Sequence, residues 1–355
     1  MNLLYKYGWD SYFEEKRNGC EQYADLNIGR VISVQGYMYH LFSMHGDIEA
    51  ELSGRLLYAA EPEQIPAIGD WVYYIKYEPK GYIVDILPRK NALTRKLPGK
   101  TSARQLMAAN VDGALIVQGP DREFNLMRLD RYLVQIIASG IQPTIILNKT
   151  DLAGNTSFYK QEINRLGRDC SVFFCSTVTG SGIQEVLNDV LMPQHTYIMV
   201  GSSGVGKSSL INSFLNTQSR SVNELSHTTG KGKHTTTTRD LFMLTNGSLL
   251  IDTPGMREFG IALDDEQAAF GGLFPLIDRM AEECRYSNCL HVNEENCAVK
   301  KALETGELDA ATYQSYIKLI KEQKRFTIQA DEKKRMGKRF GKMVREVKRF
   351  KDMNG

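Results

Sequence analysis

The chain has 355 residues, of which 42% are hydrophobic and 24% charged, with a formal net charge of +2. This length predicts two or three compact domains of a globular protein. The start, MNLLYKYGWD, lacks the apolar region of a secretory signal, and no apolar run is long enough to span a bilayer. Six cysteines are too few for a disulfide scaffold, so we expect a cytoplasmic protein with no membrane partner.

A small β-barrel is predicted near the N-terminus, after an aromatic and mixed-charge extension of residues 1–27 that could form a short helix. Five short runs rich in β-branched and aromatic residues are separated by Gly, Pro and Asp. These runs are Arg30–Gln35, Tyr37–Met44, Glu49–Leu57, Asp70–Lys76 and Tyr82–Leu87. Their number and spacing predict an OB-like or SH3-like barrel over residues 28–92.

An α/β domain is predicted over residues 105–262. Apolar runs alternate there with helical stretches such as Leu126–Ala138 and Ile183–Leu191. The runs are Gly113–Gln118, Pro143–Leu147, Ser171–Cys175, Tyr197–Val200 and Leu249–Ile251. Unbroken apolar strands separated by helices indicate a parallel sheet covered on both faces. Strand patterns end after about residue 265, and we expect a helical domain over residues 263–355.

The tetrapeptide Asn148-Lys-Thr-Asp151 ends one of these apolar runs. The Asp151 carboxylate could accept hydrogen bonds from the ring N–H and the amine of guanine, whereas adenine offers an acceptor at that ring nitrogen. Asn148 would hold the loop and the base edge, and the stem of Lys149 would cover the ring. Cys175-Ser176-Thr177 ends a later run, where GTPases place a backbone N–H on the guanine carbonyl, and Ser176 and Thr177 are the candidate binding residues.

Residues 201–208, GSSGVGKS, match the phosphate-loop motif between an apolar run and a helical stretch. Glycines let backbone N–H groups surround phosphate oxygens, and the helix N-terminus adds partial positive charge. Lys207 would reach the β- and γ-phosphates, and Ser208 would ligate Mg²⁺. The predicted nucleotide-binding residues of this segment are Gly201, Ser202, Ser203, Gly204, Val205, Gly206, Lys207, Ser208 and Ser209.

Asp252-Thr-Pro-Gly255 follows another apolar run. Asp252 suits Mg²⁺ binding through water, and Gly255 could donate its N–H to the γ-phosphate. The preceding segment, residues 230–240 (GKGKHTTTTRD), is rich in hydroxyls. It is typical of a switch that closes on Mg²⁺ and γ-phosphate, although a solvated polar loop is the alternative. Thr236 and Thr237 are both candidate metal ligands.

The residue after Gly255 bears on how water is activated. Ras-like enzymes carry a glutamine there, but this chain has Met256, whose thioether cannot orient water. Gly204 stands where potassium-activated GTPases commonly carry an asparagine, so a monovalent ion is not expected to supply charge. His234 is the candidate catalytic residue, the alternative being a loop histidine without such a role. We expect slow intrinsic hydrolysis that a partner stimulates.

The base-reading motif precedes the phosphate loop, the threonine switch and the DTPG motif. Strand adjacency in a sheet does not depend on where the chain begins, so a permuted chain can build the same pocket. The motifs therefore predict a circularly permuted P-loop GTPase that converts GTP and water to GDP and phosphate with Mg²⁺. The second switch would lead directly into the C-terminal segment.

Cys284-x4-Cys289-x-His291-x5-Cys297 places three thiols and one imidazole within 14 residues. This ligand set is typical of a closed, tetrahedral, structural zinc site. Buried cysteines without a metal beside a surface histidine are the alternative. Because protein ligands fill all four positions, we expect one structural zinc ion and no catalytic one.

The C-terminal tail is strongly basic. Residues 318–351 carry a local charge of +10, which leaves −8 for the rest of the chain. Apolar residues recur at helical spacing within it, at Met336, Phe340, Met343, Val347 and Phe350. This pattern predicts a basic amphipathic helix, for which RNA phosphates are the expected partner. Docking on the protein's own body or on an anionic membrane surface are alternatives.

In these features the chain resembles the circularly permuted small ribosomal subunit biogenesis GTPases, called RsgA or YjeQ. The barrel, permuted GTPase, cysteine cluster and basic tail occur in the same order over nearly the whole chain. GSSGVGKSS, KHTTTT, DTPG and the Cys/His spacing are the most specific parts.

The resemblance implies an N-terminal OB-fold and a zinc-binding C-terminal domain. It also implies ribosome-stimulated GTP hydrolysis in late maturation of the small subunit, with that subunit and its rRNA as partners. We expect a monomer. The alternative is a non-enzymatic, GTP-dependent binding switch for another protein or a membrane partner.

Overall fold

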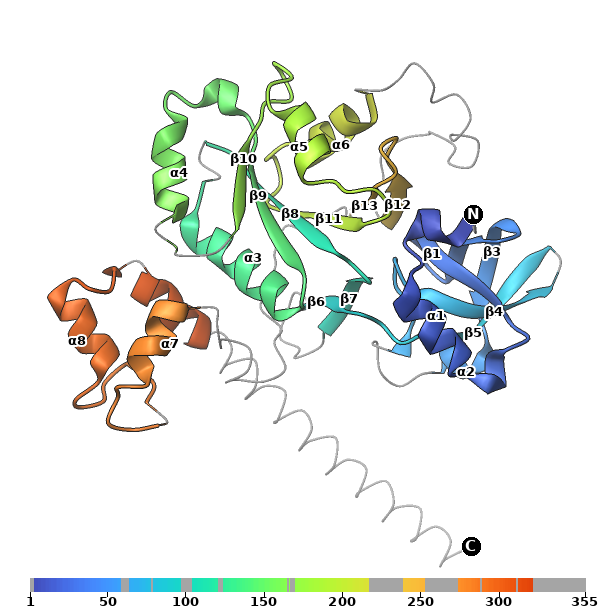
Figure 1. Cartoon of the computed structure of the whole chain (residues 1–355), viewed down its shortest axis with the longest axis horizontal. Coiled ribbons are helices and arrows are strands. Elements are labelled where there is room, and N and C mark those ends of the chain that lie inside the picture. The colour runs from blue at the N-terminus through green and yellow to red at the C-terminus, as the bar shows by residue number, and fades with distance from the viewer. Residues whose placement is uncertain are drawn as a thin grey trace, which may run out of the picture. The chain divides into compact units, whose positions relative to one another are not determined.

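The computed structural model describes residues 3–58, 64–77, 79–96, 104–120, 124–164, 166, 170–216, 239–252, 274–287, 289–310 and 312–321. The chain forms two compact units (Figure 1). One comprises residues 1–94 and 106–259, and the other residues 95–105 and 260–355. Each unit is described by itself.

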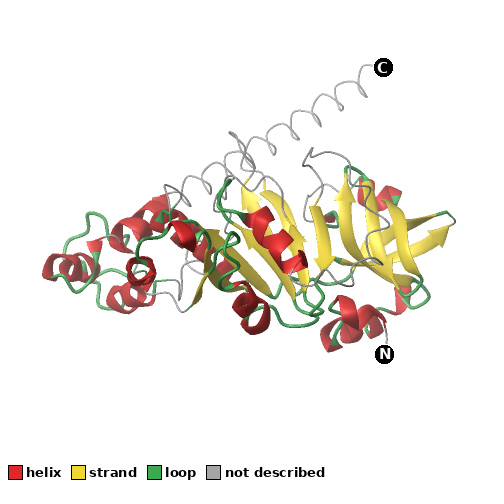
Figure 2. Cartoon of the chain, turned by 90° about the horizontal axis from the view of Figure 1, so that it is seen from above, coloured by secondary structure: helices red, strands yellow, loops and turns green. Residues whose placement is uncertain are grey.

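A five-stranded barrel begins the first unit. Its strands are β1 (Asn27–Gln35), β2 (Met38–Ser43), β3 (Gly46–Leu52), β4 (Trp71–Tyr77) and β5 (Lys80–Ile86). The strand order β1-β2-β3-β5-β4 closes on itself because β1 also pairs with β4, and the β3–β5 pairing is parallel. This barrel confirms the predicted OB-like fold (Figure 2).

One predicted barrel strand, Glu49–Leu57, was too long. Residues Gly54–Leu57 form the short helix α2 instead of continuing β3. Gly54, which weakens the interior of a strand, stands where the strand gives way to the helix. The turn also buries Leu56, whose side chain is 5% exposed, in the barrel core.

The segment before the barrel is helical and packs on it. It contains η1 (Leu3–Tyr7), α1 (Ser11–Asn18) and η2 (Glu21–Tyr23). Asp10 caps α1 by accepting hydrogen bonds from two backbone N–H groups of its first turn. Trp9 and Phe13 are buried against Trp71 of β4, with the two tryptophan rings edge-on at 4.9 Å. The extension therefore covers an aromatic side of the barrel.

The rest of the unit is an α/β sheet. Five parallel strands, β8 (Gly113–Gln118), β9 (Gln142–Leu147), β10 (Ser171–Phe174), β11 (Thr196–Val200) and β13 (Leu249–Asp252), lie beside the antiparallel β12 (Arg239–Met243). Their order is β10-β9-β8-β11-β13-β12. The five predicted apolar runs match the parallel strands within one residue at either end. Strand β12 and the two-stranded ribbon of β6 (Ala92–Lys96) and β7 (Arg104–Ala109) were not predicted.

Helices cover both faces of this sheet, as the sequence predicted (Figure 1). Helices α3 (Leu126–Ala138) and α4 (Thr156–Asn164) pack against one set of strand residues, including Ile116. Helices α5 (Ile183–Asp189) and α6 (Lys207–Asn216) pack against the alternate set, including Leu115. This alternation is why the strands read as unbroken apolar runs.

The barrel and the α/β sheet are continuous. Strand β1 pairs with β12, so that Ser33 lies opposite Asp240. Beside this junction the guanidinium of Arg30 is buried, and burial lowers its pKa to about 10, so it stays charged at neutral pH. Arg30 donates hydrogen bonds to the carbonyls of Tyr7, Gly69 and Asn110 and to the hydroxyl of Thr196. One buried cation thus joins the extension, the barrel and the first residue of β11.

The second unit is helical in its described part. It contains α7 (Pro275–Ala281), α8 (Ala298–Thr305) and further helical residues at 312–321. The four predicted metal ligands lie between α7 and α8 in the chain. The predicted basic amphipathic helix lies outside the described residues. Across the described ranges, no helix is both long and apolar enough to span a bilayer.

Candidate nucleotide site and metal centre

The predicted nucleotide-binding motifs follow the carboxyl ends of the parallel strands. Asn148 follows β9, Ser176 follows β10, Gly201 follows β11 and Asp252 ends β13. Since these strands are parallel, their carboxyl ends meet at one edge of the sheet, where ligands bind in open α/β folds. Residues as far apart in the sequence as Asn148 and Asp252 are therefore brought to one edge.

Asn148 connects the base-reading loop to the phosphate loop. Its side chain is fully buried, and its Nδ2 donates to the Val205 carbonyl at 2.9 Å. Its Oδ1 accepts from the thiol of Cys175 at 3.7 Å. A Cβ at Gly206 would lie 2.2 Å from the Asn148 Nδ2, so this contact also requires glycine there. The next residue, Lys149, has a left-handed φ of 65°, an uncommon geometry that clusters at functional sites.

Asp151 and Ser176 are in direct contact. The Ser176 hydroxyl donates to the Asp151 carboxylate, while Asp151 itself remains exposed to solvent. The Ser176 backbone N–H donates to the Ser181 carbonyl at 2.9 Å, so it serves the loop itself. The Ser176 hydroxyl thus orients the Asp151 carboxylate. Of the two residues predicted to supply a backbone N–H, Thr177 is the one that follows Ser176.

The phosphate loop has the backbone geometry that its glycines allow. Gly201, Gly204 and Gly206 have φ values of 147°, 86° and 94°, which side chains disfavour. Lys207 begins α6, and its Nζ donates to the carbonyls of Gly201 and Ser202, both at 2.7 Å. Burial lowers the pKa of Lys207, and the Asp252 carboxylate opposes that shift. The lysine therefore lies over the loop, close to a negative charge.

Within the loop, Ser203, Gly204, Ser208 and Ser209 are exposed, while Ser202 and Val205 are buried. The exposed residues form the solvent side of the loop. Predicted residues Thr236, Thr237, His234 and Gly255 lie outside the described residues.

Sequence reasoning gave no role to the side chain of Cys175. Its thiol is fully buried and hydrogen-bonded to Asn148, and burial raises its pKa to about 12, so it stays protonated and can donate. Its place, immediately after β10 and before the predicted Ser176, was the available signal.

The four predicted metal ligands converge in the second unit. Ligand atoms of Cys284, Cys289, His291 and Cys297 all lie within 4.8 Å of one another. The Cys284 and Cys297 sulfurs are 3.9 Å apart, and each lies 3.4–3.5 Å from the His291 Nδ1. A tetrahedron with metal–sulfur bonds of about 2.3 Å has a sulfur–sulfur edge of about 3.8 Å. The spacing of the Cys284, His291 and Cys297 ligand atoms therefore fits tetrahedral coordination, and the four residues together could hold a metal ion.

Local structure holds these ligands in place. Cys297 is the N-cap of α8, and its sulfur accepts from the Lys300 N–H at 3.5 Å. A helix N-terminus favours a negatively charged ligand. His291 is 3% exposed, and its carbonyl accepts from the Tyr313 hydroxyl at 2.7 Å.

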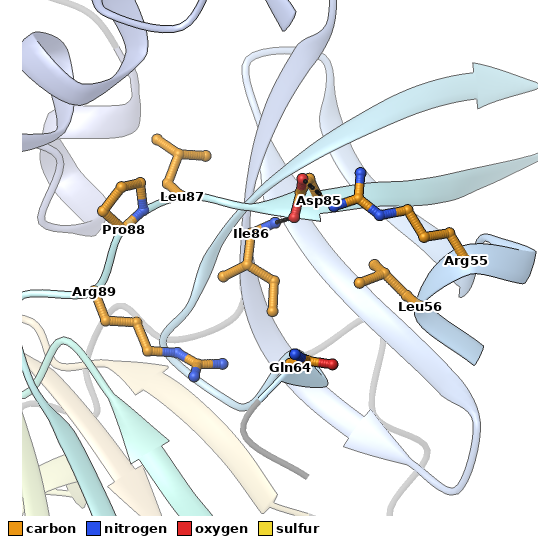
Figure 3. A pocket seen from close by; sticks show the side chains of 8 residues that line it. All are labelled: Arg55, Leu56, Gln64, Asp85, Ile86, Leu87, Pro88 and Arg89. Carbon is orange, nitrogen blue, oxygen red and sulfur yellow. Dashed lines mark hydrogen bonds and ion pairs between the residues drawn. The ribbon is translucent and has the colours of Figure 1, made fainter. Parts of the chain in front are cut away.

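A separate pocket lies on the barrel (Figure 3). Its two arginines already have acidic partners. Arg89 pairs with Asp70 at 2.7 Å, and Arg55 pairs with Asp85 at 3.4 Å. No predicted motif residue lines this pocket, so the sheet edge is the candidate functional site.

Known proteins resemble this chain along almost its whole length. The sequence profile of a family described as RsgA GTPase matches residues 86–262. The small ribosomal subunit biogenesis GTPase RsgA 1 of Bacteroides thetaiotaomicron is 39% identical over 352 residues, covering 99% of this chain and 98% of that protein.

Two solved structures share the fold. The crystal structure of YjeQ from Thermotoga maritima matches with a TM-score of 0.60 and 28% identity, over 83% of this chain and 98% of that one. The structure of YloQ, described as a circularly permuted GTPase, matches with a TM-score of 0.58 and 25% identity, over 86% and 97% of the two chains. With the motif order and the sheet edge described above, these matches establish that the chain belongs to the RsgA family of circularly permuted GTPases and is a GTP-hydrolysing enzyme.

Proposed function

We propose that this GTPase acts in late maturation of the small ribosomal subunit, and that the subunit stimulates its GTP hydrolysis. The observation that carries the proposal is the likeness, over 99% of the chain, to a relative named as a small ribosomal subunit biogenesis GTPase. The +10 charge of residues 318–351 supports contact with rRNA phosphates. We further propose a cytoplasmic monomer.

In this proposal Asp151 reads the guanine N–H groups, and the Thr177 N–H binds the guanine carbonyl. Support comes from the Ser176 hydroxyl on the Asp151 carboxylate and from the use of the Ser176 N–H within its own loop. Asn148 and Lys149 complete the base site. Residues 201–209 hold the phosphates, with Gly255 at the γ-phosphate. The proposed Mg²⁺ ligands are Ser208, Asp252 and one of Thr236 and Thr237.

The metal of the second unit is proposed to be one structural zinc ion, bound by Cys284, Cys289, His291 and Cys297. Three thiolates and one imidazole are a zinc ligand set, and the sulfur–sulfur and sulfur–nitrogen distances fit its tetrahedron. All four positions are filled by the protein, so the ion would hold the fold and leave no position for substrate.

Cosedimentation tests the proposed function. The full chain is mixed with purified small or large ribosomal subunits, with a non-hydrolysable GTP analogue or with GDP, and each mixture is centrifuged. We expect the chain to pellet with small subunits, and more of it with the analogue than with GDP. Equal recovery with large subunits, or no recovery with either, would refute the proposal and favour a GTP-dependent switch for another partner.

His234 is proposed to position the attacking water, because Met256 cannot do so. His234→Ala should lose most of the stimulation by small subunits while keeping its affinity for GTP. Steady-state phosphate release measures the first, and titration with a GTP analogue measures the second. His195→Ala is the control, because His195 lies exposed just before β11, away from the carboxyl edge of the sheet. Full stimulation of the His234 variant would remove this residue from the mechanism.

A further inference from the structure

Gln118 lies at the carboxyl edge of the sheet, between the segments that carry the predicted nucleotide-binding motifs, although no motif includes it. It is the last residue of β8, the strand between β9 with its base-reading loop and β11 with its phosphate loop. On one side its carbonyl accepts from the Asn148 N–H at 2.9 Å. Gln118 therefore lies directly beside the residue that connects the two loops.

On its other side, the end of β8 contacts the start of the phosphate loop. The register of the parallel pair β8–β11 places Val200 opposite Ile116. One residue further, Gly201 and Val117 are still in close contact, because a Cβ at Gly201 would lie 2.4 Å from the Val117 carbonyl oxygen. Strand β11 ends at Val200, and Ser202 and Gln118 are each the next residue along the chain after this Gly201–Val117 contact.

The side chains of Gln118 and Ser202 are buried but unpaired. Gln118 is 1% exposed and Ser202 is 5% exposed. Within the described ranges, neither amide atom of Gln118 nor the hydroxyl of Ser202 has a hydrogen-bond partner. The neighbouring Asn148, equally buried, uses both of its amide atoms. Buried polar groups are almost always paired, and leaving them unpaired lowers stability.

We propose that Gln118 is a positioning residue for the phosphate loop, whose amide pairs with the Ser202 hydroxyl when a guanine nucleotide is bound. The two groups are chemically matched, since an amide both donates and accepts and so does a hydroxyl. The Lys207 ammonium contacts the Gly201 and Ser202 carbonyls with two of its three donors, and a bound phosphate would accept from the third. This added contact would hold the start of the loop in place beside the end of β8. The energy of that pairing contributes to nucleotide affinity and not to the stability of the free protein.

This inference rests on the proposed nucleotide site. It predicts that replacing Gln118 leaves unchanged or raises the stability of the free protein but lowers its affinity for nucleotide. Gln118→Met keeps a side chain of similar length without polar atoms. Its nucleotide-free form should melt at a Tm equal to or higher than that of the wild type, by about 2 °C or more if the unpaired amide is costly. Its affinity for GDP with Mg²⁺ should fall about fivefold or more. A residue that only supports the fold would lower the Tm of the free protein.

Ser202→Ala and the double variant make the test specific to the pair. Each single variant should weaken GDP binding by a similar factor, and the double variant should bind no more weakly than either, since the same hydrogen bond is lost. Gln135→Met is the matched control. Gln135 is an equally buried glutamine near the end of α3, the helix that runs from the carboxyl edge of the sheet to its opposite edge. Replacing Gln135 should therefore not change the affinity for GDP.

The measurements are thermal unfolding without nucleotide and titration with a fluorescent GDP analogue, both on the full chain. Unchanged affinity in Gln118→Met, a lower Tm of its free form, or additive losses in the double variant would overturn the inference and leave the nucleotide site intact. A wild type that does not bind GDP would refute the proposed site itself. Should Gln118→Met not fold, the Ser202→Ala affinity and free-state Tm decide by the same criteria.

Discussion

Asp151→Asn is expected to weaken GTP binding at least tenfold and to raise the affinity for xanthosine nucleotides. The carboxylate offers two acceptors to the two N–H donors of guanine, whereas an amide offers one acceptor and presents its own donor to the other. An unpaired polar group in the bound state costs roughly 1–3 kcal/mol, and about 1.4 kcal/mol corresponds to a factor of ten. Xanthine carries a carbonyl in place of the amine and therefore suits the amide.

Calorimetric titration of GTP and xanthosine triphosphate into both proteins measures this exchange. Ser176 donates its hydroxyl to the Asp151 side chain, a bond that an asparagine oxygen can still accept, so the loop should keep its shape. Asp189→Asn, at an exposed aspartate that ends α5, is the control and should change neither affinity. Unchanged GTP affinity in Asp151→Asn would show that this residue does not read the base.

Cys289→Ser is expected to release the metal and to loosen the chain from about residue 270 onward, while guanine nucleotide still binds. The metal ligands belong to one compact unit and the nucleotide motifs that the structure describes to the other. Loss of a structural metal removes folding energy from the unit that it holds.

Elemental analysis and limited proteolysis measure the two effects of Cys289→Ser. The wild type should contain one zinc per chain, and the variant close to none with faster cleavage in the C-terminal unit. Cys20→Ser, at a cysteine outside the cluster, should keep its zinc. A wild type without zinc, or nucleotide binding lost together with the metal, would contradict this account.

The α/β sheet could be predicted from the sequence because its signal is local. Each strand that is covered on both faces reads as an unbroken apolar run, as in β8, where all six residues are buried. The signal for the Cys/His cluster was equally local, since four ligands within 14 residues can converge with little constraint from the rest of the fold. In the barrel, the β-branched and aromatic runs were correctly predicted as strands, but the last four residues of the run ending at Leu57 form a helix.

Contacts between distant segments could not be predicted. The hydrogen bond from Arg30 to Thr196 joins residues 166 positions apart, and an arginine in a strand pattern ordinarily faces solvent. Strand β12 takes its place through pairing with β13 and with the barrel strand β1, not through an apolar run of its own. The thiol of Cys175 and the amide of Gln118 matter only because the sheet brings other loops beside them.

The most direct test of the central claim is steady-state phosphate release by the full chain, with small ribosomal subunits, with large subunits and with neither. Met256 stands where Ras-like enzymes orient water with a glutamine, so the chain alone should hydrolyse GTP slowly. We predict that small subunits raise kcat by tens-fold or more and that large subunits do not. A rate that is the same in all three mixtures would contradict a GTPase that acts on the small subunit.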